Sequence, residues 1–257
     1  MIKISRSKLE LFMKCPRCFW LDVKHGVKRP PGFPFTINSA IDYLFKQEFD
    51  IYRKEGKPHP VMVEAGIDAV PYNGPEMDNW RDALRNGVIY HHPESDITLR
   101  GGVDDVWINP AGELIVVDYK STGSSSGSPQ IYDEYVRQLE VYQWLLSQNK
   151  YKVSPVGYWV YAQADKSQGF GHGKPVLPFN IFIKSATGKW DWIPEKLMEA
   201  KRVLDTETPP DPGEDCMGSG NQAFCKYRQA AVMVTHDAIE KSKSRVTKTK
   251  RANNSRV

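Results

Sequence analysis

Two periodicities of apolar and polar residues run along the chain, and their alternation predicts the order of helices and strands. Residues 7–10 (SKLE) have the form of a capping box and precede apolar residues at helical spacing, so a short helix should lead to Cys15. The residues from Cys15 to Cys18 are expected to form a turn. A longer helix should begin near Asn38, with an apolar face made of Ile41, Leu44, Phe45 and Phe49.

The pattern changes to strands after residue 96. Several short apolar runs follow, and the turn signal at 109–112 (NPAG) lies between two of them, which predicts a β-hairpin. Beyond a low-complexity loop at 121–129, helical spacing of apolar residues predicts a helix over 131–146. This order predicts an α/β sheet with helices on its faces. The expected strands and last helix are Ile97–Arg100, Val103–Ile108, Leu114–Lys120, Val156–Tyr161, Phe179–Ile183 and Pro194–Val203.

The turn of the hairpin decides which side chains share a face. With a three-residue loop, Asn109 pairs with Glu113, and Asp104 then faces Asp118 across the two strands. Because side chains alternate along a strand, Lys120 lies on the same face as Asp118. A four-residue loop would instead move Asp104 to the other face. The prediction of a shared site therefore depends on this turn.

Composition and charge narrow the class of protein. The 257 residues are 40% hydrophobic and 26% charged, which is typical of a folded globular chain and excludes wholesale disorder. No apolar run approaches the ~18 residues of a membrane span and no signal-peptide core is present, so we expect a cytoplasmic protein with no membrane contact. The formal net charge is +4, and the tail over 238–257 is basic and expected to be disordered. Its cations, which favour an anionic partner, are Lys241, Lys243, Arg245, Lys248, Lys250, Arg251 and Arg256.

Asp104, Asp118 and Lys120 together have the chemistry of phosphodiester hydrolysis. Two carboxylates opposed across a hairpin repel each other unless a cation lies between them, and oxygen ligands select hard ions such as Mg²⁺ or Mn²⁺. A nearby lysine can orient an attacking water or stabilise the negative charge that develops on a phosphate. The alternative is a plain charge pair on an edge strand, because Asp-x-Lys patterns arise readily by chance.

Further residues in a fixed order favour the first interpretation. Residues 102–104 (GVD) and 118–120 (DYK), followed by Gln138 and Tyr142, resemble the core of the PD-(D/E)XK nuclease superfamily and, within it, the RecB-type branch with its pattern G-x-(I/V)-D, D-x-K, Q-x-x-x-Y. The resemblance implies a restriction-endonuclease-like central mixed β-sheet flanked by helices. It implies that the two aspartates bind Mg²⁺ or Mn²⁺ and that Lys120 is the catalytic lysine. Gln138 and Tyr142 are one helical turn apart, so they are expected to share a helix face. By the resemblance they would border the DNA or organise the site, unless they are only a buried amide and a core aromatic.

The family also has an acidic residue or a histidine on the helix before the hairpin. RecB-type members carry histidine in a G-x-x-x-H motif, whereas residues 38–42 here are NSAID and so lack both the glycine and the histidine. A carboxylate binds Mg²⁺ at least as well as an imidazole does. Asp42 is therefore the expected third metal ligand, with Glu48 as the second choice. The alternative is that both are solvated acids of a helix.

Four cysteines form two pairs, one near each end of the chain. Cys15 and Cys18 form a CxxC motif, and Cys216 and Cys225 follow far along the sequence. Because disulfides are rare in the cytosol, we expect four thiolates that hold Zn²⁺ or a [4Fe–4S] cluster, with unligated thiols as the alternative. Iron–sulfur RecB-like exonucleases, including CRISPR-associated ones, join cysteines from both chain ends in one cluster, and this resemblance favours [4Fe–4S]. Those relatives divide their cysteines one and three, whereas this chain divides them two and two.

The main hypothesis is a Mg²⁺- or Mn²⁺-dependent deoxyribonuclease, an exonuclease on single-stranded or frayed DNA ends. It predicts one domain over 1–237, with the segments 5–28 and 210–230 packed together through the cysteines. Tyr119, Trp107 and Tyr142 could stack on bases or could equally belong to the core, and the basic tail is expected to add affinity for DNA. The alternative is a catalytically inactive DNA-binding or assembly module on the same fold. Neither GxGxxG nor GxxxxGK[ST] occurs, so a helicase is expected only as a partner, beside recombination or CRISPR proteins.

Overall fold

The computed structural model describes residues 1–29, 36–123, 127–167, 169, 173, 175–214, 225, 229–233 and 236. The chain forms two compact units. The larger unit consists of Met1–Arg6 and Gly32–Met198, and the smaller of Ser7–Pro31 and Glu199–Val257. Cys216 and the basic tail over 238–257, for which the sequence predicts a metal ligand and a disordered segment, lie outside the described residues.

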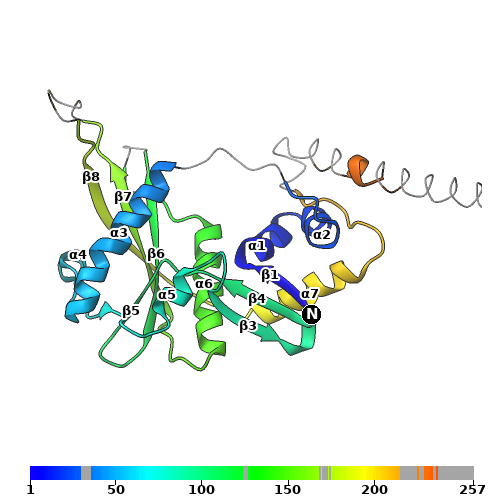
Figure 1. Ribbon diagram of the computed structural model, residues 1–257, viewed down its shortest axis with the longest axis horizontal. Coiled ribbons are helices and arrows are strands. Elements are labelled where there is room, and N and C mark those ends of the chain that lie inside the picture. The colour runs from blue at the N-terminus through cyan, green and yellow to red at the C-terminus, as the bar shows by residue number, and fades with distance from the viewer. Residues whose placement is uncertain are drawn as a thin grey trace, which may run out of the picture. The chain divides into compact units, whose positions relative to one another are not determined.

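A five-stranded mixed sheet forms the centre of the larger unit (Figure 1). Its strand order is β2-β5-β6-β7-β8, in which β6 and β7 are parallel and the other neighbours are antiparallel. The second sheet of the unit has the order β1-β4-β3. The strands are β1 (Ile2–Ser5), β2 (Val70–Pro71), β3 (Val88–His92), β4 (Ile97–Gly101), β5 (Asp105–Ile108), β6 (Leu114–Thr122), β7 (Val156–Ala164) and β8 (Phe179–Thr187).

Two long helices, α3 and α6, cover opposite faces of the central sheet (Figure 1). Phe45 of α3 packs on Tyr119 of β6, whereas Gln138 of α6 contacts the next residue of β6, Lys120. Neighbouring side chains of a strand point to opposite faces, so the helices lie on different sides of the sheet. The predicted central mixed sheet flanked by helices is therefore confirmed. The helices of this unit are α3 (Thr36–Glu55), α4 (Pro60–Glu64), α5 (Met77–Arg81), the 3-10 helix η1 (Pro93–Ser95) and α6 (Asp133–Gln148).

The register of the β5–β6 hairpin is the one expected for a three-residue loop. Asp105 pairs with Val117, and continuing the same register by one residue sets Asp104 opposite Asp118. Gly112 in the turn has a φ of 74°, a conformation that glycine adopts without the steric cost of a Cβ atom. The hairpin and its predicted register are confirmed.

Two expectations about local structure are wrong. The CxxC segment is not a turn, because α2 (Pro16–His25) begins at its proline, a residue well suited to the first helical position, and Cys15 is the N-cap. Leu44, expected on the buried face of α3, is 59% exposed. It lies about 100° around the helix from Phe45, which belongs to the buried stripe. The strand β1, which was not identified from the sequence, pairs in parallel with β4.

The smaller unit is built from helices at both ends of the chain. It contains α2, α1 (Arg6–Lys14) from Ser7 onward, and α7 (Ile193–Asp205) from Glu199 onward. Phe12 and Phe19 pack edge to face with ring centroids 5.3 Å apart, which joins α1 to α2. The Trp20 indole donates a hydrogen bond to the Thr206 carbonyl at 3.1 Å, which joins α2 to the residue after α7. Among all the described residues, no helix combines the length and apolarity that crossing a membrane requires.

Candidate active site and cysteine site

The β5–β6 hairpin brings Asp104, Asp118 and Lys120 together. Asp118 is fully buried and its carboxylate forms an ion pair with Lys120 Nζ. Asp104 Oδ2 accepts a hydrogen bond from the backbone N–H of Tyr119 at 3.0 Å, so its carboxylate is held against β6. The three groups expected from the sequence therefore lie in one place, as the hairpin register requires.

The electrostatics of the two carboxylates favour a bound cation. Burial raises the pKa of Asp104 to about 6, the negative charge of Asp118 adds to the shift, and the ammonium groups of Lys46 and Lys120 oppose it. Apart from its ion pair with Lys120, the Asp118 carboxylate has no hydrogen-bond partner among the described residues. A buried carboxylate with unused acceptor capacity is costly unless a cation satisfies it. This oxygen-only donor set fits a hard divalent ion such as Mg²⁺ or Mn²⁺.

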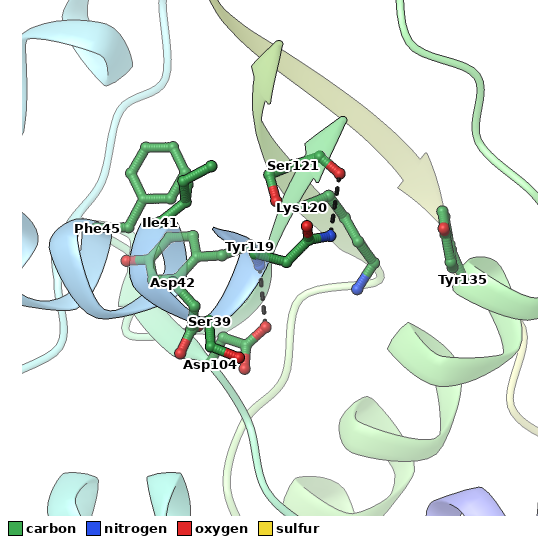
Figure 2. A pocket seen from close by; sticks show the side chains of 10 residues that line it. Ser39, Ile41, Asp42, Phe45, Asp104, Tyr119, Lys120, Ser121 and Tyr135 are labelled. Atoms are coloured by element: carbon green, nitrogen blue, oxygen red, sulfur yellow. Dashed lines mark hydrogen bonds between the residues drawn. The ribbon is translucent and has the colours of Figure 1, made fainter. Parts of the chain in front are cut away.

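A polar cavity of about 350 Å³ adjoins these groups and is named the carboxylate cavity. Asp42 of α3, Asp104 and Lys120 are among its lining residues. Figure 2 shows the two aspartates on one side of Lys120. Glu48, the second choice for the third ligand, does not line the cavity, and its carboxylate lies 2.9 Å from His59 Nε2. The geometry therefore favours Asp42 over Glu48.

Lys46 lies between two of the expected metal ligands. Its Nζ atom is 2.8 Å from Asp42 Oδ2 and 3.7 Å from Asp104 Oδ1. Within the described part of the chain, only a cysteine group brings three potential ligand atoms within 4.8 Å of one another. Asp42, Asp104 and Asp118 therefore do not converge to that degree. An internal ammonium takes the place of a cation between Asp42 and Asp104 and offsets their repulsion.

A line of hydrogen bonds connects α6 to the lysine. Lys120 Nζ donates to Gln138 Oε1 at 3.5 Å, and Gln138 Nε2 donates to Tyr142 Oη at 3.2 Å. Burial raises the pKa of Tyr142 to about 12, so its phenol is neutral. A Cβ atom added at Gly101 would lie 2.5 Å from the Tyr142 ring, so glycine is required for this packing. The expected one-turn spacing of Gln138 and Tyr142 on one helix face is confirmed.

Tyr119 and Asp105 belong to the opposite face of the sheet. The Tyr119 ring is 6% exposed, its hydroxyl donates to Asp105 Oδ2 at 2.6 Å, and burial raises its pKa well above the ordinary value. The fully buried Asp105 also pairs with Arg53 and Arg81. Tyr119 also lines the carboxylate cavity, but with 6% of its side chain exposed it offers little ring surface to a base. The alternation that directs Lys120 to the cavity also directs Tyr119 into the core.

Two residues of this region were not identified from the sequence. One is Lys46, and the other is Tyr135, whose ring centroid lies 4.8 Å from Lys120 Nζ in a cation–π contact. Lys46 follows Asp42 by one helical turn, and Tyr135 precedes Gln138 by three residues. The available signal was helical spacing from a residue already identified. That spacing predicts which residues share a helix face, but it does not predict which residues of other elements they contact.

The described cysteines form a compact group in the smaller unit. Cys15 Sγ lies 3.8 Å and Cys18 Sγ 2.9 Å from Cys225 Sγ, and all three residues are buried. Cys15 caps α2, and the backbone N–H of Cys18 points to its sulfur at 3.4 Å. Because Cys225 comes from the other end of the chain, the group links the N- and C-terminal segments.

The environment of these thiols suits a metal ion or a cluster. The contact with Cys18 lowers the pKa of Cys15 to about 5, and the same contact raises the pKa of Cys18. The thiolate is the form of cysteine that binds metals. Cys225 is disulfide-bonded, so metal binding requires its reduction. The donor chemistry admits either Zn²⁺ or an iron–sulfur cluster.

Comparisons with known proteins identify one matching family. The crystal structure of SSO0001 is similar over 81% of this chain and 79% of that chain, at 17% sequence identity and a TM-score of 0.36, which is a weak superposition. No curated protein matches the sequence. The model of the family described as the PD-(D/E)XK nuclease superfamily matches residues 36–230, a segment that includes the hairpin, α3 and α6. The chain belongs to the PD-(D/E)XK nuclease superfamily.

Proposed function

We propose that the protein is a Mg²⁺- or Mn²⁺-dependent DNA exonuclease of the RecB-like branch that acts on single-stranded or frayed DNA ends. Membership of the superfamily indicates a metal-dependent nuclease with DNA as its substrate. The observation that carries the proposal is the meeting of Asp104, Asp118 and Lys120 beside a polar cavity. Two acids and a lysine beside an accessible cavity are the side-chain chemistry that phosphodiester hydrolysis needs.

Each group at the cavity has a distinct role in this proposal. Asp104 and Asp118, with Asp42 from α3, hold the divalent ion. That ion, when bound, supplies a Lewis acid that activates water and offsets charge on the phosphate. Lys120 lines the cavity into which the phosphate enters, where its ammonium orients the attacking water and stabilises the developing negative charge.

Gln138 and Tyr142 are positioning residues in this proposal. Their hydrogen bonds end on Lys120 Nζ, and the buried Tyr142 ring cannot move without disturbing its contact with β4. The pair therefore sets the direction of the lysine from the side opposite α3. The Q-x-x-x-Y spacing that produces this line is the feature that supports the RecB-like branch.

Charge supports further contacts with DNA and with partner proteins. The seven cations over 241–257 have no acid among them, so we propose that this segment contacts DNA phosphates. Such contacts weaken as salt increases, because binding releases counterions from the DNA. A separate helicase, or recombination or CRISPR proteins, would supply the unpaired ends in this proposal.

A catalytically inactive DNA-binding or assembly module is the second candidate. One observation favours it: the Lys46 ammonium already lies between Asp42 and Asp104, so an internal cation satisfies carboxylates that would otherwise hold a metal ion. Asp118 and Lys120 favour the active enzyme, because a site that binds without turnover has no need of both.

The test is Mn²⁺-dependent degradation of end-labelled single-stranded DNA by anaerobically purified protein. We expect wild type to cut and Lys120→Ala to be slower by about 10²–10³-fold, because the variant lacks the charge that stabilises the transition state. Lys57→Ala is the matched control, since Lys57 is exposed and pairs only with Glu55 among the described residues. Mononucleotide products indicate an exonuclease, and internal fragments an endonuclease. If wild type and Lys120→Ala are both folded, bind DNA and cut nothing, the binding module is the correct function.

We also propose that Cys15, Cys18 and Cys225, with Cys216, hold a structural [4Fe–4S] cluster, and that Zn²⁺ is the alternative. Ligands from both chain ends favour the cluster by resemblance. The 3.8 Å between Cys15 Sγ and Cys225 Sγ is close to the separation of two sulfurs on a tetrahedral zinc ion with bonds of about 2.3 Å, whereas the 2.9 Å between Cys18 Sγ and Cys225 Sγ is shorter than that. Iron, zinc and acid-labile sulfide analysis of anaerobic protein decides. Iron with sulfide supports the cluster, and zinc without iron supports the zinc ion. The absence of both metals supports free thiols.

A further inference from the structure

A second cavity, of about 560 Å³, adjoins the carboxylate cavity and differs from it in chemistry. The two cavities share Lys120, Ser121 and Tyr135. The second one is also lined by Tyr132 and Tyr161 and is named the tyrosine cavity. Among its described lining residues Lys120 alone is charged, and that lysine lies at the wall common to both cavities.

We propose that the tyrosine cavity binds an unpaired nucleobase of the strand whose phosphate is cut beside Lys120. This inference rests on the nuclease function proposed for the same site. Aromatic rings stack on any base, whereas a cavity with a single cation at its edge offers little to a phosphate. In a nucleic acid, a base and its phosphate belong to one nucleotide. Neighbouring cavities of these two kinds therefore match one nucleotide and its backbone.

The segments that carry these tyrosines are held in place before any ligand arrives. The Tyr132 carbonyl accepts the backbone N–H groups of Tyr135 at 2.8 Å and Val136 at 3.2 Å, so the first turn of α6 fixes its position. The Tyr132 side chain is nevertheless 55% exposed, and its ring stands at 84° to that of Tyr135, with centroids 5.3 Å apart. The Tyr161 side chain is 4% exposed and its hydroxyl donates to the Gln130 carbonyl at 2.9 Å, so Tyr161 supports the wall of the cavity and Tyr132 presents the exposed ring. A base that enters meets a preformed wall, and binding to such a wall costs little ordering.

Tyr135 connects the base site to the chemistry. Its ring contacts the Lys120 ammonium, and Figure 2 shows Lys120 between Tyr135 and the aspartates. A base stacked against this wall would therefore hold its own backbone next to Lys120.

The inference explains a preference for single strands in physical terms. A base inside a duplex is already paired and stacked, so it reaches a cavity only by flipping out of the helix. A base in a single strand or at a frayed end is free to enter. Because stacking is tolerant of base identity, the cavity selects unpaired DNA without selecting a sequence.

The first experiment measures binding of a labelled single strand in the presence of a chelator, and Mn²⁺-dependent cleavage of the same strand. We expect Tyr132→Ala and Tyr132→Leu each to weaken binding and kcat/KM roughly 5- to 150-fold, the range for one stacked base, and Tyr132→Phe to stay near wild type. Tyr43→Ala is the matched control, because Tyr43 is an exposed tyrosine of α3 that lines neither cavity. Affinity for blunt duplex should not change in any variant.

The second experiment replaces one nucleotide at a time by an abasic residue. In wild type, one abasic position next to the cut should cost as much affinity as the loss of the ring, whereas in Tyr132→Ala the same abasic position should cost almost nothing. Equal abasic penalties in both proteins, or equal weakening of single strands and duplex by Tyr132→Ala, overturn the inference while the nuclease stands. Wild type that neither binds nor cuts any DNA overturns the proposed function itself.

Discussion

The carboxylate site and the cysteine site of this protein are built in opposite ways. Asp104, Asp118 and Lys120 come from one hairpin, whereas Cys15 and Cys225 are separated by 210 positions in the sequence. The first group borders a cavity and carries charges that repel one another. The second is buried, and Leu11 packs against it. The first arrangement suits reversible binding of a substrate, and the second suits a permanently bound ligand that joins the chain ends.

The two sites differ in their cost to the folded protein. The raised pKa of Asp104 means that its charged form is disfavoured in the folded protein, a cost that an active site accepts for its chemistry. The cysteines carry no comparable cost once a ligand holds them, because metal binding adds to the free energy of folding. Substitutions at the hairpin should therefore change the reaction and spare the fold, and substitutions at the cysteines should do the reverse.

The largest expected effect is on catalysis. Asp104→Asn should lower the rate of Mn²⁺-dependent cleavage about 10²–10³-fold. The same substitution should stabilise the metal-free protein at pH 8 by roughly 1 kcal/mol, because it removes a charge that the fold disfavours. This figure is reduced for solvent screening, since the Asp104 side chain is 27% exposed. Cleavage assays and thermal melting measure the two effects. Asp68→Asn, at an exposed acid that does not line the cavity, is the control. Cleavage by Asp104→Asn at the wild-type rate would contradict the conclusion that the hairpin carboxylates serve the reaction.

The next largest effect is on stability. In reduced, metal-loaded protein, Cys18→Ser should lower the free energy of unfolding by about 3 kcal/mol or more, because a buried ligand is lost and metal binding is coupled to folding. The cleavage rate per folded molecule should stay within about twofold of wild type. Denaturant unfolding of both proteins, before and after treatment with a chelator, measures this. After treatment with the chelator, the wild-type protein should have a free energy of unfolding close to that of the variant. A variant that keeps its stability and loses its activity would mean that the cysteines serve the reaction directly.

A smaller effect tests the support of the lysine. Gly101→Ala places a methyl group 2.5 Å from the Tyr142 ring and should cost about 1–3 kcal/mol of stability by overpacking. Displacement of Tyr142 should also disturb the hydrogen bonds to Lys120 and slow cleavage roughly tenfold. Gly112→Ala is the control: its φ of 74° makes alanine unfavourable there, but a Cβ atom meets nothing within 4 Å, so stability should fall without a loss of rate. Equal rates in both variants would remove the positioning role.

The smallest effect is a shift in pH dependence. The ionised form of Asp104 is the one that binds a cation, and its pKa of about 6 is raised above the ordinary value. At limiting Mn²⁺ the cleavage rate should therefore rise with pH through about 6 and level off above it. Lys46→Met removes a positive charge that lowers this pKa, so the midpoint should move upward by roughly half a unit. Rates measured from pH 5 to 8 give the midpoints, and an unchanged or lower midpoint contradicts the role given to Lys46.

Local chemistry explains which parts of the site could be predicted from the sequence. The turn at 109–112 specifies a loop length, and the loop length sets the register that brings Asp104 and Asp118 together. The spacing of Gln138 and Tyr142 specifies a shared helix face in the same direct way. Each of these predictions needs only the geometry of one element or one turn, and both are confirmed.

Predictions that needed the packing of one element on another were less successful. Leu44 fits the predicted apolar face of α3 but is exposed, whereas the other three residues of that face, Ile41, Phe45 and Phe49, are buried. Tyr119 was a candidate for base stacking beside Lys120, but α3 covers its face of the sheet and leaves only 6% of the side chain exposed. The position of Lys46 between two carboxylates depends on how α3 lies across the hairpin. Sequence spacing does not specify any of these contacts.

By itself the sequence determined the elements of local origin: the hairpin, its register, the helix that carries Gln138, and the set of acids and cysteines available for metal binding. The tertiary structure alone decided which of these groups meet, with Asp42 at the cavity, Tyr135 beneath the lysine and Cys225 beside the CxxC motif. The physical reason is range. Turns and helical spacing are set by bonds and sterics over a few residues, whereas contacts between distant segments follow from the burial of whole apolar faces, a collective effect that no short stretch of sequence encodes.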